Sequence, residues 1–483
     1  MTTDQTADRD TARGAEPAHE VLMTGKQRVA LIVLLTASFT LAVDFSILNV
    51  ALPSVGADVG FGIENLQWIA TTFALCSAGL TLLMGRVADI AGRRRMFLIG
   101  MVLLGVGSVV GGLATTPAVL LVARVAQGVA TAIVVPAALA LLIGAFPEGR
   151  ARDRALGLNG SLMAAGFTTG AILGGLLTDL LSWRWAFFIN VPIAVAVLVV
   201  APIVLQDSRS AQRSRLDVPG AALVTLGLLA LVYGLTHATE TAWTDPVTLG
   251  ALAAAVVLLT VFVLVERRSE FPLVPLGMLA RSNVAWGNIA GALAFVTETS
   301  LVFLLTLYLQ EVLGYTPLGA GLSFAVLGVG TVLGGLIGPR IIGRFGNKAA
   351  IVGGFLVQAV ATLSLVLVSD APGSIWLVLV ATFVGGVANL VVIVGFMVTA
   401  TSGVPASEQG LATGLTTMSQ QVGITMGTPI MSAVLTAVVL ANAAPDASAV
   451  LAGVTTAIWV NGGICVAGAL AVAAFLRGRP IAA

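Results

Sequence analysis

Residues 85–95 read GRVADIAGRRR and lie between two apolar runs, 65–86 and 96–115. Each run is about 20 residues long, which is the length of an α-helix that crosses a lipid bilayer. Gly85 and Gly92 permit a tight reversal between the two expected helices, because glycine adopts backbone conformations that other residues avoid. This stretch therefore predicts a short polar turn between two membrane-spanning helices.

The charged residues of this stretch have a characteristic spacing. Asp89 can cap or pair at a helix end, and Arg93 and Arg94 follow it. Basic residues alone are explained by the excess of lysine and arginine in cytoplasmic loops of membrane proteins. The G-x-x-x-D-x-x-G-R-R spacing is not explained in this way, and it indicates a particular family of membrane proteins.

Apolar runs fill nearly the whole chain. Of its 483 residues, 58% are hydrophobic and 10% are charged, and the mean hydropathy is +1.02. The runs exclude a soluble protein and predict an all-α polytopic membrane protein with fourteen transmembrane helices. The predicted spans are 29–52, 65–86, 96–115, 118–143, 156–178, 185–205, 218–238, 246–265, 283–311, 317–339, 349–368, 374–400, 410–440 and 451–476.

The composition also excludes several classes of function. The net charge is only +1, and no basic stripe exists to neutralise phosphates, so we expect no nucleic-acid partner. The two histidines and two cysteines are too scattered to hold a metal, and no other cofactor is expected. No G-x-x-x-x-G-K-[ST] loop is present, so ATP is not the energy source. We therefore expect no enzymatic chemistry, and no obligate protein partner is evident.

The basic residues predict the orientation of the chain in the cell membrane. All but two of the 24 lysines and arginines lie in the termini or in loops that follow even-numbered spans. The exceptions are Arg124, within a span, and Arg184, in an odd-numbered loop. Since basic residues accumulate on the cytoplasmic side, we predict that both termini and every even-numbered loop are cytoplasmic.

The two halves of the chain are related. A weaker echo of the first stretch, PRIIGRFGNK (339–348), follows the tenth span, and Gly92 aligns with Gly346. A repeat of this kind predicts two six-span bundles around a central site. The expected parts are a disordered cytoplasmic tail (1–25), an N-terminal six-helix bundle (26–205), a linker with two additional transmembrane helices (206–281), a C-terminal six-helix bundle (282–477) and a cytoplasmic C-terminal tail (478–483).

Further segments support a family assignment. They are LAVDFSILNVALP (41–53), LLVARVAQGVATA (120–132), WRWAFFINVPI (183–193) and YLQEVLGYTPLGAGL (308–322). Together with 85–95, they resemble the major facilitator superfamily and, within it, the fourteen-span drug:proton antiporters. This resemblance implies the major facilitator fold and proton-coupled export of lipophilic, often cationic, drugs by alternating access. The expected partners are a lipophilic small molecule, protons and the lipid bilayer.

The fifth span resembles the antiporter motif of that family, usually G-x-x-x-G-P-x-x-G-G, with Ala171 in place of the proline. The motif glycines here are Gly166, Gly170, Gly174 and Gly175. The first three lie on one helix face and permit a close approach of another helix. The tenth span repeats the spacing at Gly330, Gly334 and Gly338. The resemblance implies that the two glycine ridges meet across the halves and slide; the alternative is small-residue packing within each half.

Three charged residues lie deep in apolar spans: Asp44, Arg124 and Glu298. At about 1.5 Å per residue, all three lie at a similar depth in the outer half of the membrane. A charge in the bilayer core costs about 2.5 kcal/mol or more and usually faces a cavity where it has a function. We therefore expect all three residues to take part in proton coupling.

Asp44 and Arg124 are expected to form a charge pair that changes when Asp44 takes a proton. A carboxyl group gains proton affinity in apolar surroundings and loses it beside a cation; a fixed ion pair that only joins the first and fourth spans is the alternative. For Glu298 three roles stay open. It is a second proton carrier, a counter-charge for a cationic substrate, or a polar group satisfied by Thr297, Thr299 or Asn288.

Candidates for substrate contact are Asn49, Gln67, Phe45, Phe295 and Glu298. The aromatic rings can stack on flat lipophilic molecules or lie over cations. A close alternative to a multidrug exporter is a dedicated exporter of one natural product or lipid. A more distant alternative is a proton-coupled uptake symporter.

Overall fold

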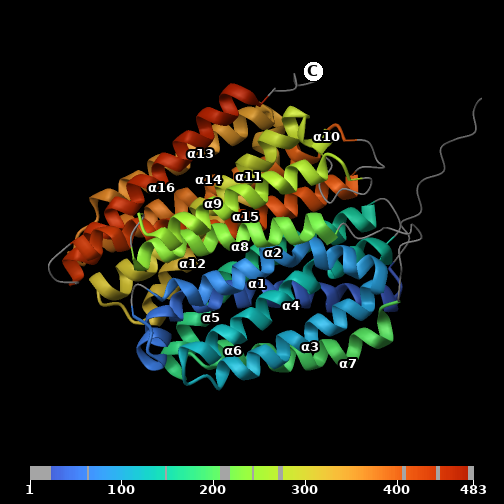
Figure 1. Cartoon of the computed structure of the whole chain (residues 1–483), viewed down its shortest axis with the longest axis horizontal. Coiled ribbons are helices and arrows are strands. Elements are labelled where there is room, and N and C mark those ends of the chain that lie inside the picture. The colour runs from blue at the N-terminus through green and yellow to red at the C-terminus, as the bar shows by residue number, and fades with distance from the viewer. Residues whose placement is uncertain are drawn as a thin grey trace, which may run out of the picture.

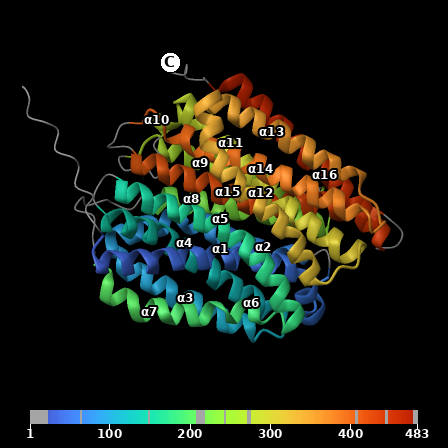
Figure 2. The same cartoon turned by 180° about the vertical axis from the view of Figure 1, so that it is seen from behind.

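The computed structural model describes residues 23–62, 65–146, 150–206, 218–241, 244–269, 276–404, 409–441 and 446–476. Within these ranges the chain is almost entirely helical, and long helices lie roughly side by side (Figures 1 and 2). Residues 1–22, 207–217 and 477–483, which include most of both predicted tails and of the polar segment before the seventh span, lie outside the described residues.

Each of the fourteen predicted spans contains a helix. The first part of the chain forms α1 (Gly25–Val59), α2 (Gln67–Ala91), α3 (Arg93–Gly112), α4 (Pro117–Ala145), α5 (Arg150–Leu180), α6 (Trp185–Phe188) and α7 (Asn190–Val204). The second part forms α8 (Val218–Glu240), α9 (Pro246–Glu266), α10 (Leu276–Leu279), α11 (Ser282–Leu307), η2 (Tyr308–Val312), α12 (Pro317–Phe345), α13 (Asn347–Ser364), η3 (Leu365–Leu367), α14 (Ser374–Thr401), α15 (Gln409–Ala441) and α16 (Ala447–Phe475).

Most of these helices are suited to a bilayer. In the described ranges, eleven helices are long and apolar enough to cross a membrane, or twelve if the bent α2 is one span. α8 contains a shorter apolar helix, Pro219–Leu235. The chain is thus a multi-pass membrane protein, and the count of fourteen is consistent with its helices.

The helices gather in two groups that α8 bridges. α1–α7 pack against one another, and so do α11–α16. α8 packs on α2 of the first group and on α15 of the second, and α9 packs along α8. In Figure 1, α8 and α9 (green) accordingly run between the blue helices of the first group and the orange helices of the second group. One bond at this seam joins the Thr225 hydroxyl to the carbonyl of Gly79.

The predicted turn lies between α2 and α3, and its repeat lies between α12 and α13. Gly92 ends α2 with φ 105°, and Gly346 ends α12 with φ 81°. Both values lie in the region that L-residues avoid, so glycine is favoured at both positions. The alignment of Gly92 with Gly346 is therefore confirmed in the backbone.

Other residues of the 85–95 stretch have separate roles. Asp89 pairs with Arg93 one helical turn later, at 2.9 Å, and the Arg94 guanidinium donates to the carbonyl of Pro202 on α7 at 2.7 Å. The prediction that Gly85 forms part of the reversal is wrong, because α2 continues to Ala91. A Cβ at Gly85 would instead lie 3.4 Å from the ring of Pro136 on α4, so this glycine serves helix packing.

The prediction that the two glycine ridges meet across the halves is also wrong. Gly166, Gly170 and Gly174 face α1, where Cβ atoms would meet the carbonyls of Phe39, Val43 and Ile47 within 3 Å. Gly330 and Gly334 face α14 in the same way, against the carbonyls of Phe383 and Val387. Each ridge therefore holds a helix pair together within its own group, since small residues let two backbones approach closely.

α5 and α12 do meet across the groups, but through other residues. A Cβ at Gly175 would lie near the carbonyl of Pro317, and a Cβ at Gly321 would lie 2.8 Å from the carbonyl of Ala171. Both contacts lie in the half of the molecule that carries the 313–316 turn, the half that the distribution of basic residues predicts to face the outside. At Gly175 and Gly321, the backbones of α5 and α12 are so close that a side chain would not fit between them.

Hydrogen bonds between described residues also cross between the groups. Gln310 of η2 donates to the carbonyl of Val50 on α1 at 2.8 Å. Near the middle of α2 and α15, Gln421 donates to Ser77 at 2.7 Å. Thr425 donates to the carbonyl of Ala74 at 3.0 Å. Like the α5–α12 contact, the bond from Gln310 lies in the half with the 313–316 turn, and the other two lie near the middle of the helices.

The first prediction concerns the α1–α5 contact. A Cβ at Gly174 would lie 2.1 Å from the carbonyl oxygen of Ile47, and this backbone atom cannot rotate away. We expect Gly174→Ala to destabilise the protein by about 1 to 3 kcal/mol, the usual cost of overpacking, seen as a lower midpoint of thermal unfolding. Gly144→Ala on α4, where a Cβ would meet nothing within 4 Å, is the control. Equal midpoints for the two variants would contradict the contact.

Candidate functional site

A buried ion pair joins α1 and α4. Asp44 lies in the middle of α1, Arg124 lies two turns into α4, and each side chain is 1% exposed. Arg124 Nη1 lies 3.5 Å from Asp44 Oδ2. At this distance the contact is a loose ion pair rather than a tight hydrogen bond. The structure thus brings together two of the three charged residues that the sequence analysis selected.

Two amide side chains hold the other oxygen of the Asp44 carboxylate. Gln127 Nε2 donates to Asp44 Oδ1 at 3.0 Å, and Asn190 Nδ2 of α7 donates to the same atom. Both amides also donate to Ser108 Oγ on α3, at 3.0 Å and 3.2 Å. Gln127, Asn190 and Ser108 are fully buried. The cluster therefore connects α1, α3, α4 and α7 through polar groups with no contact to bulk water.

Sequence reasoning missed these three residues. Gln127 lies three residues after Arg124 in the same helix, and that spacing puts both on one face. Asn190 lies in the 183–193 segment that supported the family resemblance. The spacing was a usable signal for Gln127, whereas only the packing of α7 and α3 against α1 and α4 identifies Asn190 and Ser108.

The Arg124 guanidinium has partners besides Asp44. Its Nε donates to the carbonyl of Ile69 at 2.9 Å, and its Nη1 donates to Gln127 Oε1 at 2.8 Å. Its carbon Cζ lies 4.2 Å from the centre of the Phe73 ring, a cation–π distance. These partners keep the guanidinium solvated by protein when its attraction to Asp44 weakens.

The hydrogen bonds around Asp44 leave one of its carboxylate oxygens able to take a proton. Asp44 Oδ2 accepts no hydrogen bond in the described part of the chain, while Oδ1 accepts two. A proton on Oδ2 would neutralise the carboxylate and remove most of its Coulomb attraction to Arg124. Such a proton would give the buried pair a second electrostatic state, and this coupling role of Asp44 stays a prediction.

Three phenylalanine rings extend from the ion pair toward the surface of the helix group. The Phe73 ring that lies under Arg124 is 5.9 Å from the Phe45 ring, and Phe45 is 6.0 Å from Phe167 of α5. Phe45 and Phe167 are partly exposed, whereas Phe73 is buried. These three rings, which we call the aromatic group, thus link the charged cluster to accessible apolar surface on α1 and α5.

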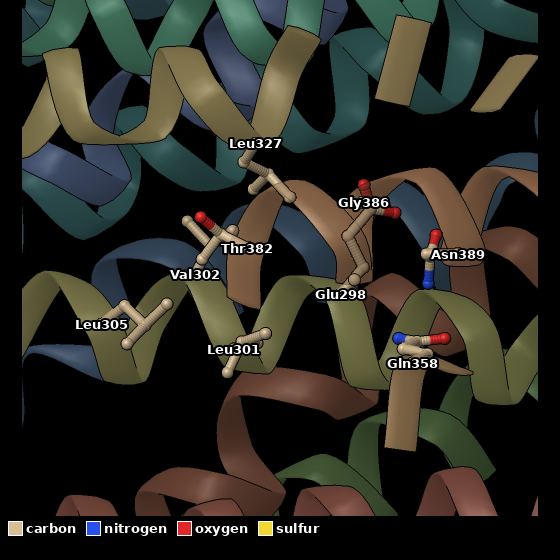
Figure 3. Close-up of a pocket in the computed structure, with 10 residues that line it drawn as sticks. Glu298, Leu301, Val302, Leu305, Leu327, Gln358, Thr382, Gly386 and Asn389 are labelled. Carbon is tan, nitrogen blue, oxygen red and sulfur yellow. The ribbon is translucent and has the colours of Figure 1, made fainter. Parts of the chain in front are cut away.

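Glu298 lies apart from this cluster, in the second helix group. It lines a small cavity together with residues of α11, α12, α13 and α14 (Figure 3). No residue proposed to satisfy it does so: Thr299 donates to the carbonyl of Phe295, and Asn288 to that of Val284. Thr297 likewise donates to backbone carbonyls. Of the three roles left open for Glu298, that of a polar group satisfied by one of these neighbours is therefore wrong, and the other two stay predictions.

The remaining candidates are divided between the two groups. Asn49 and Gln67 are buried on α1 and α2, at 6% and 0% exposure. Phe295 packs edge-on against Phe396, with ring centres 6.5 Å apart, inside the core of the second group. The structure thus places Phe45 beside the ion pair and Phe295 away from it. Substrate contact by any of these residues stays a prediction.

The sequence is similar to a known protein family and to several export and resistance proteins. Residues 34–428 match the family model of the Major Facilitator Superfamily. The chain is 36% identical to a puromycin resistance protein of Streptomyces alboniger over 84% of this chain and 81% of that protein. It is 36% identical to a cephamycin export protein of Amycolatopsis lactamdurans over 87% of each chain. A multidrug resistance protein of Mycobacterium tuberculosis is 31% identical over 88% of this chain and 78% of that protein.

Solved structures share the fold. A POT family transporter in complex with 5-aminolevulinic acid aligns with a TM-score of 0.69 at 15% identity, covering 93% of this chain and 96% of that chain. A human organic anion transporter aligns with a TM-score of 0.61 at 16% identity, covering 92% and 99%. At these identities the likeness establishes the helix arrangement alone.

Proposed function

The chain belongs to the Major Facilitator Superfamily, and on this premise we propose that it is a proton-coupled exporter of lipophilic, often cationic, drugs or toxic compounds. The observation that carries this proposal is the buried Asp44–Arg124 pair, in which Asp44 Oδ2 lies 3.5 Å from Arg124 Nη1 and accepts no hydrogen bond in the described part of the chain. An ionisable group inside a membrane bundle is expensive and is usually retained for ion transfer. The similarity to drug-resistance and export proteins supports the same class of substrate.

The coupling step follows from the contacts of Arg124. When a proton binds Asp44 Oδ2, the attraction to Arg124 falls, while the bonds from Arg124 to Ile69 and Gln127 remain. The guanidinium then shifts relative to the Phe73 ring that it covers. Because Phe73 touches Phe45, this shift alters the aromatic group, where a flat lipophilic substrate can stack. Proton binding and substrate binding thereby oppose each other.

The conformational change of the transport cycle breaks and re-forms the contacts between the two helix groups. The α5–α12 contact at Gly175 and the bond from Gln310 to Val50 both lie in the outer half. A protein joined in this way is closed toward the outside and has to break these contacts to release substrate there. Rocking of the two groups about a central site is the usual form of alternating access. In this scheme both termini are cytoplasmic, and no covalent chemistry takes place.

A second candidate function is the dedicated export of one natural product. Two of the relatives described above are named for a single antibiotic, puromycin or cephamycin, and only one is named for many drugs. The Asp44 cluster serves both functions equally, because it couples protons and does not select substrate.

The second prediction tests the direction of transport and the breadth of substrate. We expect purified protein in vesicles with an imposed pH gradient to move lipophilic compounds against the proton flow, with movement lost when the gradient is collapsed by a protonophore. The panel contains cationic, neutral and anionic lipophiles, including puromycin and a cephamycin. Activity toward one compound alone identifies a dedicated exporter. Movement of substrate together with the protons would overturn antiport in favour of an uptake symporter.

A further inference from the structure

The turn between α12 and α13 carries three basic side chains. They are Arg340 and Arg344 at the end of α12 and Lys348 at the start of α13. The two arginines are exposed, and the lysine is partly exposed. The stretch 339–348 contains no acidic residue, and no ion pair among the described residues includes any of the three. This turn is therefore a cluster of positive charge without a negative partner of its own.

The first turn of the repeat, between α2 and α3, is built differently. There Asp89 pairs with Arg93 at 2.9 Å. The alignment of the two turns puts Gly343 at the position of Asp89, so the second turn has lost the acid. The excess of basic residues in cytoplasmic loops predicts positive charge at both turns. The first turn neutralises part of its charge internally, whereas the second leaves all of its charge to an external partner.

The two arginines keep donors for such a partner. Arg340 Nη1 donates to the carbonyl of Leu336 at 3.0 Å, and Arg344 Cζ lies 5.5 Å from the centre of the Phe345 ring. A guanidinium has five N–H groups, and no other bond from either arginine to a described residue is found. A planar guanidinium binds the oxygens of a phosphate group through two parallel hydrogen bonds. The cluster is thus suited to a phosphate group.

An exposed apolar face of α12 leads directly to this cluster. Leu322, Val329, Leu333 and Leu336 are all exposed, and their spacing puts them on one side of the helix with Arg340. Leu322 lies in the half where α5 and α12 are in contact and the two groups are closed. Its exposure therefore marks the outer surface of the helix bundle rather than a space between the groups. In a multi-pass membrane protein, this surface faces lipid.

The length of this face matches one leaflet of a bilayer. Val329 precedes Arg340 by 11 residues, which corresponds to about 16 Å along a helix. The hydrocarbon core of a bilayer is about 30 Å thick, so one leaflet contributes about 15 Å. A lipid chain that lies along the face from Val329 to Leu336 thus has its headgroup beside Arg340.

We propose that the α12–α13 turn binds the phosphate group of an anionic phospholipid, whose acyl chain lies along the exposed face of α12. Charge complementarity selects this occupant, because a zwitterionic lipid would bring a positive charge of its own to the three basic side chains. The turn is also at the end of the helices that is predicted to be cytoplasmic, and anionic lipids are concentrated in the cytoplasmic leaflet. Binding here does not rest on the proposed export function.

The test uses photochemical labelling of the full-length protein in detergent micelles. The probe is a phosphatidylglycerol with a photoactivatable diazirine in its acyl chain, and labelled peptides of α12 are quantified by mass spectrometry. We expect unlabelled phosphatidylglycerol to compete with the probe at least tenfold more effectively than phosphatidylcholine. Each basic side chain near an anionic headgroup contributes about fivefold in affinity. Glycerol phosphate, which has the headgroup but no chain, should not compete.

Two variants of one glycine give a matched pair. A Cβ at Gly343 would meet nothing within 4 Å, so both Gly343→Asp and Gly343→Asn fit the structure. Gly343→Asp restores the acid of the first turn within one helical turn of Arg340, and it should lower labelling of α12 about fivefold. Gly343→Asn has the same shape without the charge and should leave labelling unchanged.

A second pair of variants separates this turn from the charge of the whole surface. Arg340→Gln combined with Arg344→Gln should lower labelling of α12 about 25-fold. Arg267→Gln combined with Arg268→Gln removes the same charge from two exposed residues at the end of α9 and should not change it. Equal losses in the two double variants would show attraction to overall charge and overturn the site.

Three further results would also contradict the proposal. They are equal competition by phosphatidylcholine and phosphatidylglycerol, equal labelling of Gly343→Asp and Gly343→Asn, and full competition by glycerol phosphate. The last would mean that the basic cluster binds free phosphate compounds and that the apolar face has no part in binding. None of these readouts involves transport, so failure of the export proposal leaves them interpretable.

Discussion

Asp44→Asn is expected to abolish proton-driven transport. The amide has almost the shape of the carboxyl group but cannot bind and release a proton, so the two electrostatic states of the pair with Arg124 become one. Arg124 retains the carbonyl of Ile69 and Gln127 Oε1 as acceptors, and a neutral side chain at position 44 resembles protonated Asp44. We therefore expect folded protein in which accumulation of substrate against its gradient falls to the level of empty vesicles.

Two measurements separate lost coupling from lost folding. Exchange of labelled for unlabelled substrate needs no net proton movement, and it should continue in Asp44→Asn. The control is Asp58→Asn in the same helix. Asp58 pairs with Arg184 at 2.6 Å, but both side chains are substantially exposed, and such pairs contribute little. That variant should transport normally. Full uphill transport by Asp44→Asn would leave the pair as a purely structural link between α1 and α4.

Gly175→Val is expected to force the outer halves of the two groups apart. A Cβ at this position would lie 2.4 Å from the carbonyl oxygen of Pro317 and 3.1 Å from Leu318 Cα, and both atoms belong to the backbone of α12. Overpacking costs about 1 to 3 kcal/mol, which changes the ratio of outer-closed to outer-open protein by about 5- to 150-fold. Transport falls because the cycle requires the closed state.

The population shift is measurable as a distance. Spin labels at Leu181 and Leu322, both exposed, report the outer ends of the two groups after the free Cys76 and Cys465 are replaced by serine. Gly175→Val should lengthen the distance between the labels. Gly335→Val on α12, where a Cβ would meet nothing within 4 Å, should not change it. An unchanged distance in Gly175→Val would mean that α5 and α12 do not form the outer closure.

Much of the fold could be predicted from short-range patterns. Each apolar run of bilayer length contains a helix, because a helix in lipid has to satisfy its backbone internally and cover itself with apolar side chains. The alignment of Gly92 with Gly346 located two equivalent turns, since a positive φ favours glycine wherever it occurs. The pairing of Asp44 with Arg124 followed from their similar depth in the membrane.

Other features could not be predicted, because they depend on which helices meet. Glycine at every fourth position indicates that a backbone comes close, but it does not identify that backbone. The ridge on α5 therefore seemed to face α12 and in fact faces α1. Asn190 and Ser108 likewise become partners of Asp44 only because α7 and α3 pack against α1 and α4.

The sequence by itself thus determined the membrane-spanning helices, the two related halves, the family and the presence of buried charge. Each of these follows from composition and from spacing along one helix. The tertiary structure decided which oxygen of Asp44 accepts no hydrogen bond, which glycines lie where the two groups meet, and that Glu298 lies apart from Asp44, beside Asn389 and Gln358. The physical reason is that hydrogen bonds, ion pairs and close packing act over a few ångströms, between residues that lie far apart in the chain.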